Sequence, residues 1–450
     1  MKVVGLITEY NPFHNGHKYH IEEAKRVTGA DYAIAVMSGN FVQRGTPAMI
    51  DKYSRAEMAL NNGVDLVLEL PVCYATGSAE FFAHGAVSLL EQLGIVDYLC
   101  FGSESGDIDL IKEAAEFLLE APATFNDELL SLLKEGFTYP AARLKALENY
   151  LITSSVDKVS SPLSKILMEP NNILGIEYMK AIYRLSSSLI PVTIKRQSAH
   201  YHDINLAVHN ASATSELHLP SDSSVPAIPA ISSATANPVI SSATAIRSAL
   251  QDTDGISGLP ITENSVPADV YKYLSINYLK TYPITIEDFA QVIKYKLMSE
   301  DTLSLARYVD ITSDLADRMK HILNYEISIS ELSKALKTKN LTLTRINRAL
   351  IHMLLNITAN TFEEYNRHGY ASYARVLGIK ETSSHLLRKA SKIGRIPIIT
   401  KVSTAEKQLD SLGMQMFSQD LLATHLYNQA IYEKFKTSIP NEYKHGISII

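Results

Sequence analysis

Short apolar segments alternate with segments of helical spacing along the N-terminal part of the chain, and this alternation constrains the fold more than any other feature. The segments Lys2–Thr8, Asp31–Met37 and Val64–Leu70 are typical of buried strands. Between them, Lys18–Val27 has helical spacing and Asp51–Asn62 also reads as a helix. Strands separated by helices form βαβ units, which build a parallel sheet covered by helices. We therefore expect an α/β, Rossmann-like domain with a parallel sheet.

The turn after the first strand carries His14-Asn15-Gly16-His17, the strongest functional signal in the sequence. In a parallel sheet this turn opens at the carboxyl ends of the strands, where ligands bind. Gly16 lets the backbone approach a phosphate, and the N-terminus of the helix that begins near His17 favours phosphate oxygens. Two histidines three apart can stabilise the charge of an in-line displacement without a covalent bond. We therefore assign His14 and His17 as catalytic residues that act on a phosphate group.

Two other interpretations of the histidines are weaker. Both side chains could simply cap the helix, which is the more common role for either histidine alone. A zinc site would need further His or Cys ligands nearby, and the sequence supplies no such set. We therefore predict no protein-bound metal site.

A second motif, Ser241 to Arg247, leads into a segment of helical spacing. The hydroxyls of Ser241 and Thr244, a helix N-terminus and the guanidinium of Arg247 together make a clamp for a departing pyrophosphate. An N-capping group followed by a solvated arginine is the alternative, and for this motif alone it is the better one. Because the histidine motif also indicates phosphate binding, we favour phosphate binding for this motif too.

Four further residues stand where predicted strands end or a helix begins. Gly102 follows Tyr98–Phe101, expected as a fourth strand, and its lack of a side chain can admit an adenine ring. Asn171 and Asn172 can hydrogen-bond a base or ribose, although Pro-Asn-Asn is also a common turn and helix cap. Arg196 follows Val192–Lys195, expected as a last strand, and can hold a phosphate; a solvated arginine is the alternative.

The loop after the second strand offers polar side chains to a small acid or a base. These side chains are Asn40, Gln43 and Arg44, and we predict that they bind substrate. In the helix that follows, Asp51, Lys52 and Arg55 are expected to form a solvated face.

At 450 residues the chain is too long for one small core, and its composition changes along the sequence. We expect a catalytic domain over residues 1–203, with a helical insert at about 107–185. Residues 204–239 are rich in Ser, Ala, Thr and Pro and read as a flexible loop. The phosphate-binding motif and its helix, residues 240–260, close the catalytic domain. Residues 261–450 are expected to form a mainly α-helical, basic domain.

Cysteine content and hydropathy indicate a cytoplasmic protein. The two cysteines, Cys73 and Cys100, lie in apolar surroundings typical of buried thiols in a reducing compartment. The N-terminus lacks the long apolar segment of a signal peptide, and no apolar run reaches the length of a membrane span. We therefore expect no membrane partner.

Charge is distributed unevenly along the chain. The formal net charge is -6, yet Lys334–Lys401 holds 13 Lys and Arg against three acids, a surplus of about +10 that leaves about -16 elsewhere. Such asymmetry indicates a polyanionic partner. Arg388, Lys389 and Lys392 share an expected helix and can form a positive stripe. For any one of them, an ordinary solvated position is the alternative.

Several segments together resemble the HIGH superfamily of nucleotidyltransferases and, within it, the bacterial tRNA(Met) cytidine acetate ligase family. Besides the two motifs above, the resemblance is carried by Gly5–Tyr19, Ser38–Gly45, Asp65–Pro71, Phe101–Glu104, Pro170–Gly175, Arg196 and Tyr201–Asp203. It spans roughly residues 1–250, and the helical remainder is compatible in length. The Ser/Ala/Pro-rich stretch before Ser241 departs from the family pattern.

The resemblance implies an enzyme that activates acetate with ATP and Mg²⁺ as acetyl-adenylate, then acetylates N4 of the wobble cytidine of elongator tRNA(Met). It implies that ATP is bound by Ile7, Thr8, Glu9, Tyr10, Asn11, Pro12, Phe13, His14, Asn15, Gly16, His17, Lys18, Tyr19, His20, Gly102, Asn171, Asn172 and Arg196. The basic segment with Arg388, Lys389 and Lys392 would then hold the tRNA backbone.

Two other functions remain open from the sequence. A metabolite nucleotidyltransferase would transfer AMP or CMP to a small phosphate ester, but such enzymes are usually much shorter. A non-catalytic RNA-binding protein that retains the fold is least favoured, because the His-x-Gly-His motif is intact.

Overall fold

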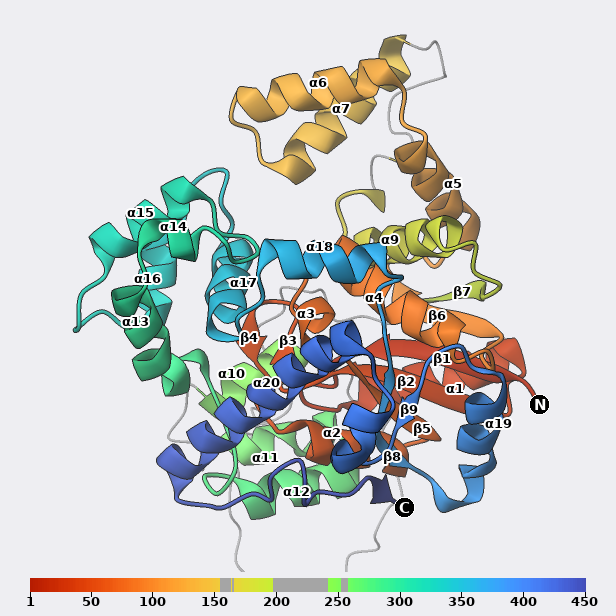
Figure 1. The fold of residues 1–450 in the computed structure, drawn as a ribbon. Coiled ribbons are helices and arrows are strands. Elements are labelled where there is room, and N and C mark those ends of the chain that lie inside the picture. Colours follow the sequence, from red (N-terminus) through yellow and green to blue (C-terminus); the bar gives the residue numbers. More distant parts are fainter. Residues whose placement is uncertain (154–162, 164–165, 197–241, 252–257) are drawn as a thin grey trace, which may run out of the picture.

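The parallel sheet expected from the N-terminal alternation is present and extends further than expected. The computed structural model describes residues 1–153, 163, 166–196, 242–251 and 258–450. Within these residues, eight strands form one mostly parallel sheet in the order β10-β8-β5-β2-β1-β6-β7, with β9 paired to β8 (Figure 1). The fold is therefore α/β, as the sequence predicts. The loop expected over residues 204–239 lies outside the described residues.

Parallel strands form the centre of the sheet. They are β1 (Val3–Thr8), β2 (Tyr32–Ser38), β5 (Leu66–Leu70), β6 (Tyr98–Ser103) and β7 (Ile190–Lys195). The helices between them include α1 (Asn15–Thr28), α2 (Lys52–Asn61), α3 (Val72–Ala75), α4 (Ala79–Gln92) and α9 (Pro170–Arg184). Because these strands are parallel, their carboxyl ends meet at one edge of the sheet. The last strand expected at Val192–Lys195 is confirmed as β7.

The sheet continues into the C-terminal part of the chain. β8 (Ala374–Ile379) pairs antiparallel with β5, and β9 (Ile398–Ile399) and β10 (Ser448–Ile449) pair with β8. All six residues of β8 are buried. The boundary expected at residue 261 therefore does not separate the sheet from the helices that follow. β8 is short, stands alone among helices and is buried on both faces, so its sequence shows no alternation of apolar and polar residues that would indicate a strand.

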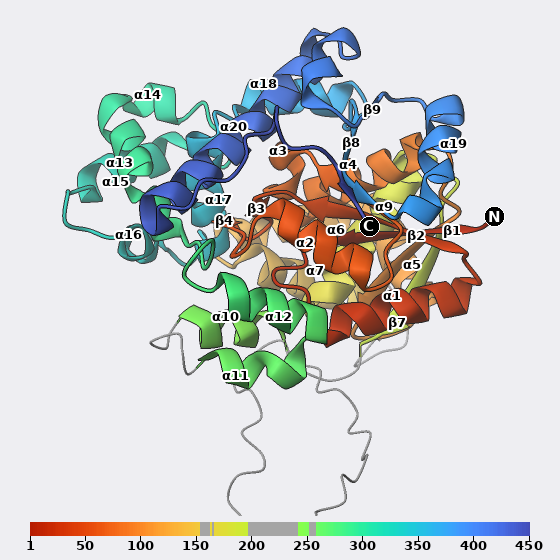
Figure 2. The same ribbon diagram turned by 90° about the horizontal axis from the view of Figure 1, so that it is seen from below.

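Helices flank the sheet and extend beyond it. One group forms an arm at the top of Figure 1: α5 (Ile108–Leu119), α6 (Ala123–Lys134) and α7 (Tyr139–Thr153). A second group lies together in Figure 2: α10 (Ala243–Gln251), α11 (Gly258–Thr262) and α12 (Ala268–Asn277). The others used below are α17 (Leu343–Leu354), α18 (Ala359–Arg367), α19 (His385–Ile393) and α20 (Ser411–Phe435). Among the described helices, none is long and apolar enough to cross a membrane.

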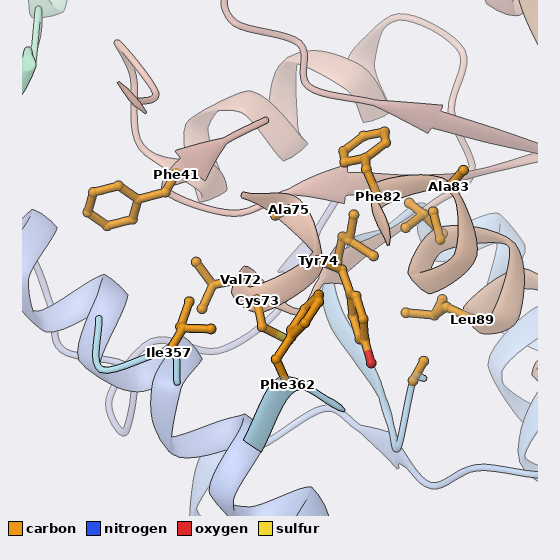
Figure 3. Packing of buried hydrophobic residues seen from close by; sticks show 14 of the residues in the cluster. Phe41, Val72, Cys73, Tyr74, Ala75, Phe82, Ala83, Leu89, Ile357 and Phe362 are labelled. Carbon is orange, nitrogen blue, oxygen red and sulfur yellow. The ribbon is translucent and has the colours of Figure 1, made fainter. Parts of the chain in front are cut away.

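A buried aromatic pair shows how the C-terminal helices join the core. The ring centroid of Tyr74 in α3 lies 5.6 Å from that of Phe362 in α18 (Figure 3). Gly85 of α4 gives Tyr74 its room, because a Cβ there would lie 2.4 Å from Cγ of Tyr74. Cys73 and Cys100 are both buried and free, as the sequence predicts. The sheet and the helices after it thus share one core.

Helix α2 buries two cations that were expected to be solvated, so that prediction is wrong. Lys52 is 1% exposed, and its Nζ lies 2.8 Å from Glu69 Oε2 and 2.6 Å from Glu442 Oε1. Arg55 is fully buried and donates to the backbone carbonyls of Glu9, Ser38, Gly39 and Ile50. The Arg55 guanidinium therefore ties the turn after β1 to the turn after β2. These partners are distant in sequence, so the spacing within α2 could not indicate them.

Candidate active site

A cavity of about 310 Å³ opens at the carboxyl edge of the sheet. Thr8 of β1, Gly102 of β6 and Ile194 of β7 line it. The remaining walls come from α1, α4, α9, α10 and the loop after β2. Both predicted phosphate-binding motifs therefore meet in one cavity, although more than 220 residues separate them in sequence.

His14 and His17 cap the helix that they begin. His14 is the residue before α1, and its Nδ1 accepts the backbone N–H of Gly16 at 3.0 Å. Nδ1 of His17 accepts the backbone N–H of His14 at 3.3 Å. The two rings stack with their centroids 3.7 Å apart, and both line the cavity. Both histidines therefore cap the helix, and each uses only its Nδ1 to do so.

Among the described residues, the second nitrogen of each ring has no hydrogen-bond partner. Burial, together with the charges of Arg196 and Arg247, lowers the pKa of His14 to about 3. Burial, with neighbouring His14, lowers the pKa of His17 well below its usual value. Both imidazoles are therefore neutral near pH 7, and because each Nδ1 accepts a hydrogen bond, each Nε2 carries the hydrogen. The motif thus places two fixed N–H donors in the cavity lining.

The start of α10 forms the facing wall. The Oγ of Ser242 accepts the backbone N–H of Ala245 at 3.1 Å, which caps this helix. Arg247 donates to Thr244 Oγ1 at 3.1 Å and to the backbone carbonyl of Asn11 at 2.7 Å. The Asn11 contact joins the second motif directly to the histidine turn. Ser242, Thr244 and Arg247 line the cavity, whereas Ser241 lies outside the described residues.

Part of the cavity lining is apolar. The apolar lining residues are Phe101, Leu174, Tyr178 and Ile194. Phe101 and Leu174 fall in segments that carry the family resemblance, but sequence reasoning assigned none of the four a role. Leu174 and Tyr178 stand four residues apart on α9 and therefore share one face of the helix. The spacing alone did not indicate that this face lines a cavity. An apolar slot of this kind suits the flat ring of a nucleobase.

Gly102 and Arg196 lie together at the ends of β6 and β7. The backbone N–H of Arg196 donates to the carbonyl of Ser103 at 2.9 Å. A Cβ on Gly102 would stand 3.4 Å from Cγ of Arg196, so a side chain there would narrow the cavity. Both residues line it, and neighbouring Lys195, which sequence reasoning missed, does so too.

The two asparagines at the start of α9 have different places. Asn171 lines the cavity. Asn172 is buried, and its Oδ1 accepts the backbone N–H groups of Glu104 at 3.0 Å and Ser105 at 3.1 Å. Asn172 therefore shapes the turn after β6, and Asn171 is the member of the pair that can reach a ligand.

The loop after β2 divides in the same way. Gln43 and Arg44 line the cavity, and the backbone N–H of Gln43 donates to Glu9 Oε1 at 2.9 Å. Asn40 is buried, and its Oδ1 accepts the backbone N–H of Lys52 at 2.9 Å. Asn40 thus anchors the loop, whereas Gln43 and Arg44 face the cavity.

The histidine segment also separates into lining and supporting residues. The lining residues are Ile7, Thr8, Glu9, His14, Gly16, His17, Tyr19 and His20. Tyr10, Asn11, Pro12 and Phe13 are buried and build the turn, in which Asn11 Oδ1 accepts the backbone N–H of Met49 at 2.8 Å. Asn15 donates to the carbonyl of Asn264 at 2.9 Å, and Lys18 is exposed.

The basic helix α19 is not brought to the cavity. Its first residue, His385, packs against Tyr32 at the start of β2, with ring centroids 4.9 Å apart. Just after α19, the backbone N–H of Arg395 donates to the carbonyl of Gln92, ahead of β6. These contacts put α19 at the amino edge of the sheet, near the N-terminus in Figure 1. The cavity lies at the carboxyl edge, and a strand of six residues, about 20 Å long, separates the two edges. Arg388, Lys389 and Lys392, which are exposed on α19, therefore lie at the opposite edge of the sheet from the cavity.

Part of the basic surplus is neutralised inside the fold. Arg345 and Arg348 of α17 both pair with Asp310, at 3.2 and 3.1 Å. Arg375 of β8 is buried against Glu442. In the part of the chain that the structure describes, no group of three or more His, Cys, Asp or Glu side chains is placed to hold a metal ion.

Comparison with known proteins identifies relatives across the whole chain. The family model for HIGH Nucleotidyl Transferase matches residues 1–218 and 230–442. A tRNA(Met) cytidine acetate ligase of Thermoanaerobacter sp. (strain X514) is 38% identical over 431 residues, covering 96% of each chain. One of Clostridium tetani (strain Massachusetts / E88) is 38% identical over 430 residues, covering 95% of each.

Solved structures agree with these relatives. The crystal structure of Thermotoga maritima TmcAL bound with alpha-thio ATP is 30% identical, with a TM-score of 0.82 over 100% of both chains. The apo form of that protein gives a TM-score of 0.85 with the same identity and coverage. Identity at this level over nearly the full length of both partners is decisive: the chain belongs to the tRNA(Met) cytidine acetate ligase family, and it is an enzyme of the ligase class.

Proposed function

We propose that this protein activates acetate with ATP as acetyl-adenylate and transfers the acetyl group to N4 of the wobble cytidine of elongator tRNA(Met). One observation carries the proposal: two neutral imidazole donors and Arg247 line the same cavity as a set of apolar side chains. Such a lining suits a nucleotide, whose phosphates need donors and whose base needs apolar contacts. ATP binding is also supported by the relative bound to an ATP analogue, and the tRNA by the names of the relatives.

In the first proposed step, a carboxylate oxygen of acetate attacks the α-phosphorus of ATP. The bond from that phosphorus to the bridging oxygen breaks, and pyrophosphate leaves. The Nε2–H groups of His14 and His17 donate to the phosphate oxygens as their charge grows. Arg247, Thr244 and the N-terminus of α10 receive the departing pyrophosphate.

In the second proposed step, the cytidine N4 attacks the acetyl carbon of the mixed anhydride. The amine loses a proton, and AMP leaves with the electron pair of the broken C–O bond. Gln43 and Arg44 line the cavity from the loop after β2, and we assign them to the acetate or the entering base. Nothing in this chemistry needs a covalent enzyme intermediate.

Mg²⁺ fits this proposal as the counter-ion of the triphosphate. Mg²⁺ is usually held by one or two carboxylates together with substrate phosphates rather than by an all-protein cage. The carboxylate of Glu9 lines the cavity and can serve in that way. When bound, the ion would neutralise charge on the phosphates.

The first test is ATP–pyrophosphate exchange with labelled pyrophosphate. Acetate should support exchange without tRNA, because adenylate formation precedes acetyl transfer. Transfer of labelled acetate to tRNA should then require ATP and an unmodified wobble cytidine. Exchange that depends instead on a small phosphate ester would show a metabolite nucleotidyltransferase. No exchange with either substrate would contradict both functions.

We further propose that α19 contacts tRNA phosphates away from the reacting base. Replacing Arg388, Lys389 and Lys392 with Glu should reduce the slope of log binding constant against log salt by about 2 to 3, because each phosphate contact contributes about 0.9. Filter binding of tRNA at several salt concentrations measures this slope. Acetate-dependent exchange should stay unchanged, since α19 lies at the opposite edge of the sheet. If the triple variant keeps the wild-type slope, the docking surface lies instead on the side of Arg44.

A further inference from the structure

Glu104 follows β6 directly and is bound to the start of α9 by a set of reciprocal hydrogen bonds. Its Oε1 accepts from Asn171 Nδ2 at 2.6 Å and from the backbone N–H of Asn171 at 3.3 Å. Its Oε2 accepts the backbone N–H of Asn172 at 2.9 Å. In return, Asn172 Oδ1 accepts the backbone N–H of Glu104. Glu104 itself is not among the residues that line the cavity, whereas Asn171 is.

This arrangement fixes which way the Asn171 amide points. A carboxylate oxygen only accepts hydrogen bonds, so it can face the NH₂ group of an amide but not its oxygen. The short contact with Glu104 Oε1 therefore commits Nδ2 of Asn171. In the part of the chain that the structure describes, Oδ1 of Asn171 forms no hydrogen bond. That oxygen is the atom which Asn171 can offer to a bound ligand.

Asn171 stands beside apolar residues of the cavity wall. Leu174 and Tyr178 follow it on the same face of α9, at the spacing of a helix, and all three line the cavity with Phe101 and Gly102. The ring of Tyr178 also packs against Phe101, with centroids 5.4 Å apart. This wall suits the base of a nucleotide whose phosphates are held by the histidines and Arg247, and an acceptor beside it would meet the polar edge of the base.

We infer that Glu104 is a positioning residue for base specificity: by holding the NH₂ of Asn171, it presents an acceptor that selects the amino group of adenine. The inference rests on the proposed ATP site. Adenine offers an N–H donor at position 6, whereas guanine and hypoxanthine offer a carbonyl oxygen there. With guanine or hypoxanthine, Oδ1 of Asn171 would face the carbonyl oxygen at position 6. Both atoms are acceptors and neither would gain a donor, which disfavours binding.

Direct binding of ATP and ITP tests this, because their bases differ at position 6 without the 2-amino group of guanine. The wild-type protein should bind ATP at least about tenfold more tightly than ITP. Purine riboside triphosphate, with hydrogen at position 6, should bind between the two. This series uses the unaltered protein, so it remains informative whatever the variants do.

Glu104→Gln then tests the residue itself. When its side-chain oxygen accepts the backbone N–H of Asn172, its NH₂ faces Asn171, whose backbone N–H then loses the long 3.3 Å contact with residue 104. The Asn171 amide can turn to accept from that NH₂, which presents its own NH₂ to the base. The preference for ATP over ITP should therefore fall at least about tenfold, with ITP binding gained rather than only ATP binding lost. A merely structural loss would weaken both nucleotides together.

Glu169→Gln is the matched control. Glu169 also precedes α9, and its Oε2 accepts from Nδ2 of Asn172, an amide that does not line the cavity. The same substitution there should leave the ATP preference unchanged. A Glu104→Gln variant that folds and keeps the wild-type preference would overturn the inference, as would a wild-type protein that binds ATP and ITP equally. A wild-type protein that binds no ATP would overturn the proposed function as well.

Discussion

His14→Asn and His17→Asn should each slow acetate-dependent ATP–pyrophosphate exchange about 100-fold or more, while the protein keeps its thermal stability. Asn places an oxygen close to the position of Nδ1, so it can still accept the backbone N–H that each histidine holds. Asn is also a favoured N-cap residue. It carries no donor at the position of Nε2, and loss of one such donor costs about 100- to 1000-fold in rate.

The comparison with alanine separates the two roles of the histidines. His14→Ala and His17→Ala remove both the cap and the donor, so they should lose about 1 kcal/mol of stability in addition to the rate. Urea unfolding and exchange kinetics on the same four variants measure both quantities. If the Asn variants retained wild-type exchange, the histidines would be caps alone, and the site assignment would be wrong.

Lys52→Met should lower the free energy of unfolding by about 3 to 5 kcal/mol, which is the usual cost of removing one partner from a buried ion pair. Lys52 Nζ contacts both oxygens of Glu69, Thr424 Oγ1 and Glu442 Oε1, all at 2.6 to 2.9 Å. Without it, the two buried carboxylates face each other, and Arg375 still pairs with both of them. Urea unfolding at neutral pH measures the loss.

An exposed ion pair provides the control. Lys436→Met removes the partner of Glu433, where both side chains are more than half exposed, and should cost less than about 1 kcal/mol. Combining Lys52→Met with Glu442→Leu should recover part of the loss, because one unpaired carboxylate is removed with its cation. A Lys52→Met variant as stable as wild type would show that this network does not hold the fold together.

The pH dependence of this network has a defined sign. Burial raises the pKa of Glu442, but Lys52 and Arg375 outweigh it and hold that pKa at about 2, below the ordinary 4.5. The folded protein therefore keeps Glu442 charged where the unfolded chain takes up a proton. Its contribution to stability is complete above pH 4.5 and is lost as the pH falls towards 2.

The sequence predicted those features whose signal is local. The alternation of strands and helices gave the α/β class, and the position of the histidine motif after β1 placed it correctly at the carboxyl edge. The second motif could be paired with the first only by chemical argument, because no local signal shows that Arg247 reaches the carbonyl of Asn11.

Features that depend on distant partners could not be predicted. Lys52 and Arg55 look like solvated residues within their own helix, and only Glu442 and the carbonyls of two other turns explain their burial. The basic stripe on α19 was visible in the sequence, but which edge of the sheet it occupies depends on its packing against Tyr32. Asn171 and Asn172 are chemically identical, and only their different surroundings at the start of α9 distinguish them.

The position of β8 has a consequence for synthesis of the protein on the ribosome. β5 ends at Leu70 and its neighbour β8 begins at Ala374, so 303 residues must be translated before the pair can form. At about 5 to 20 residues per second, this takes about 15 to 60 s. During that interval the emerging chain presents the apolar strand β5 with one side unpaired, which is a template for association with other chains. A chaperone that shields this strand until Ala374–Ile379 emerges would therefore raise the yield of active enzyme.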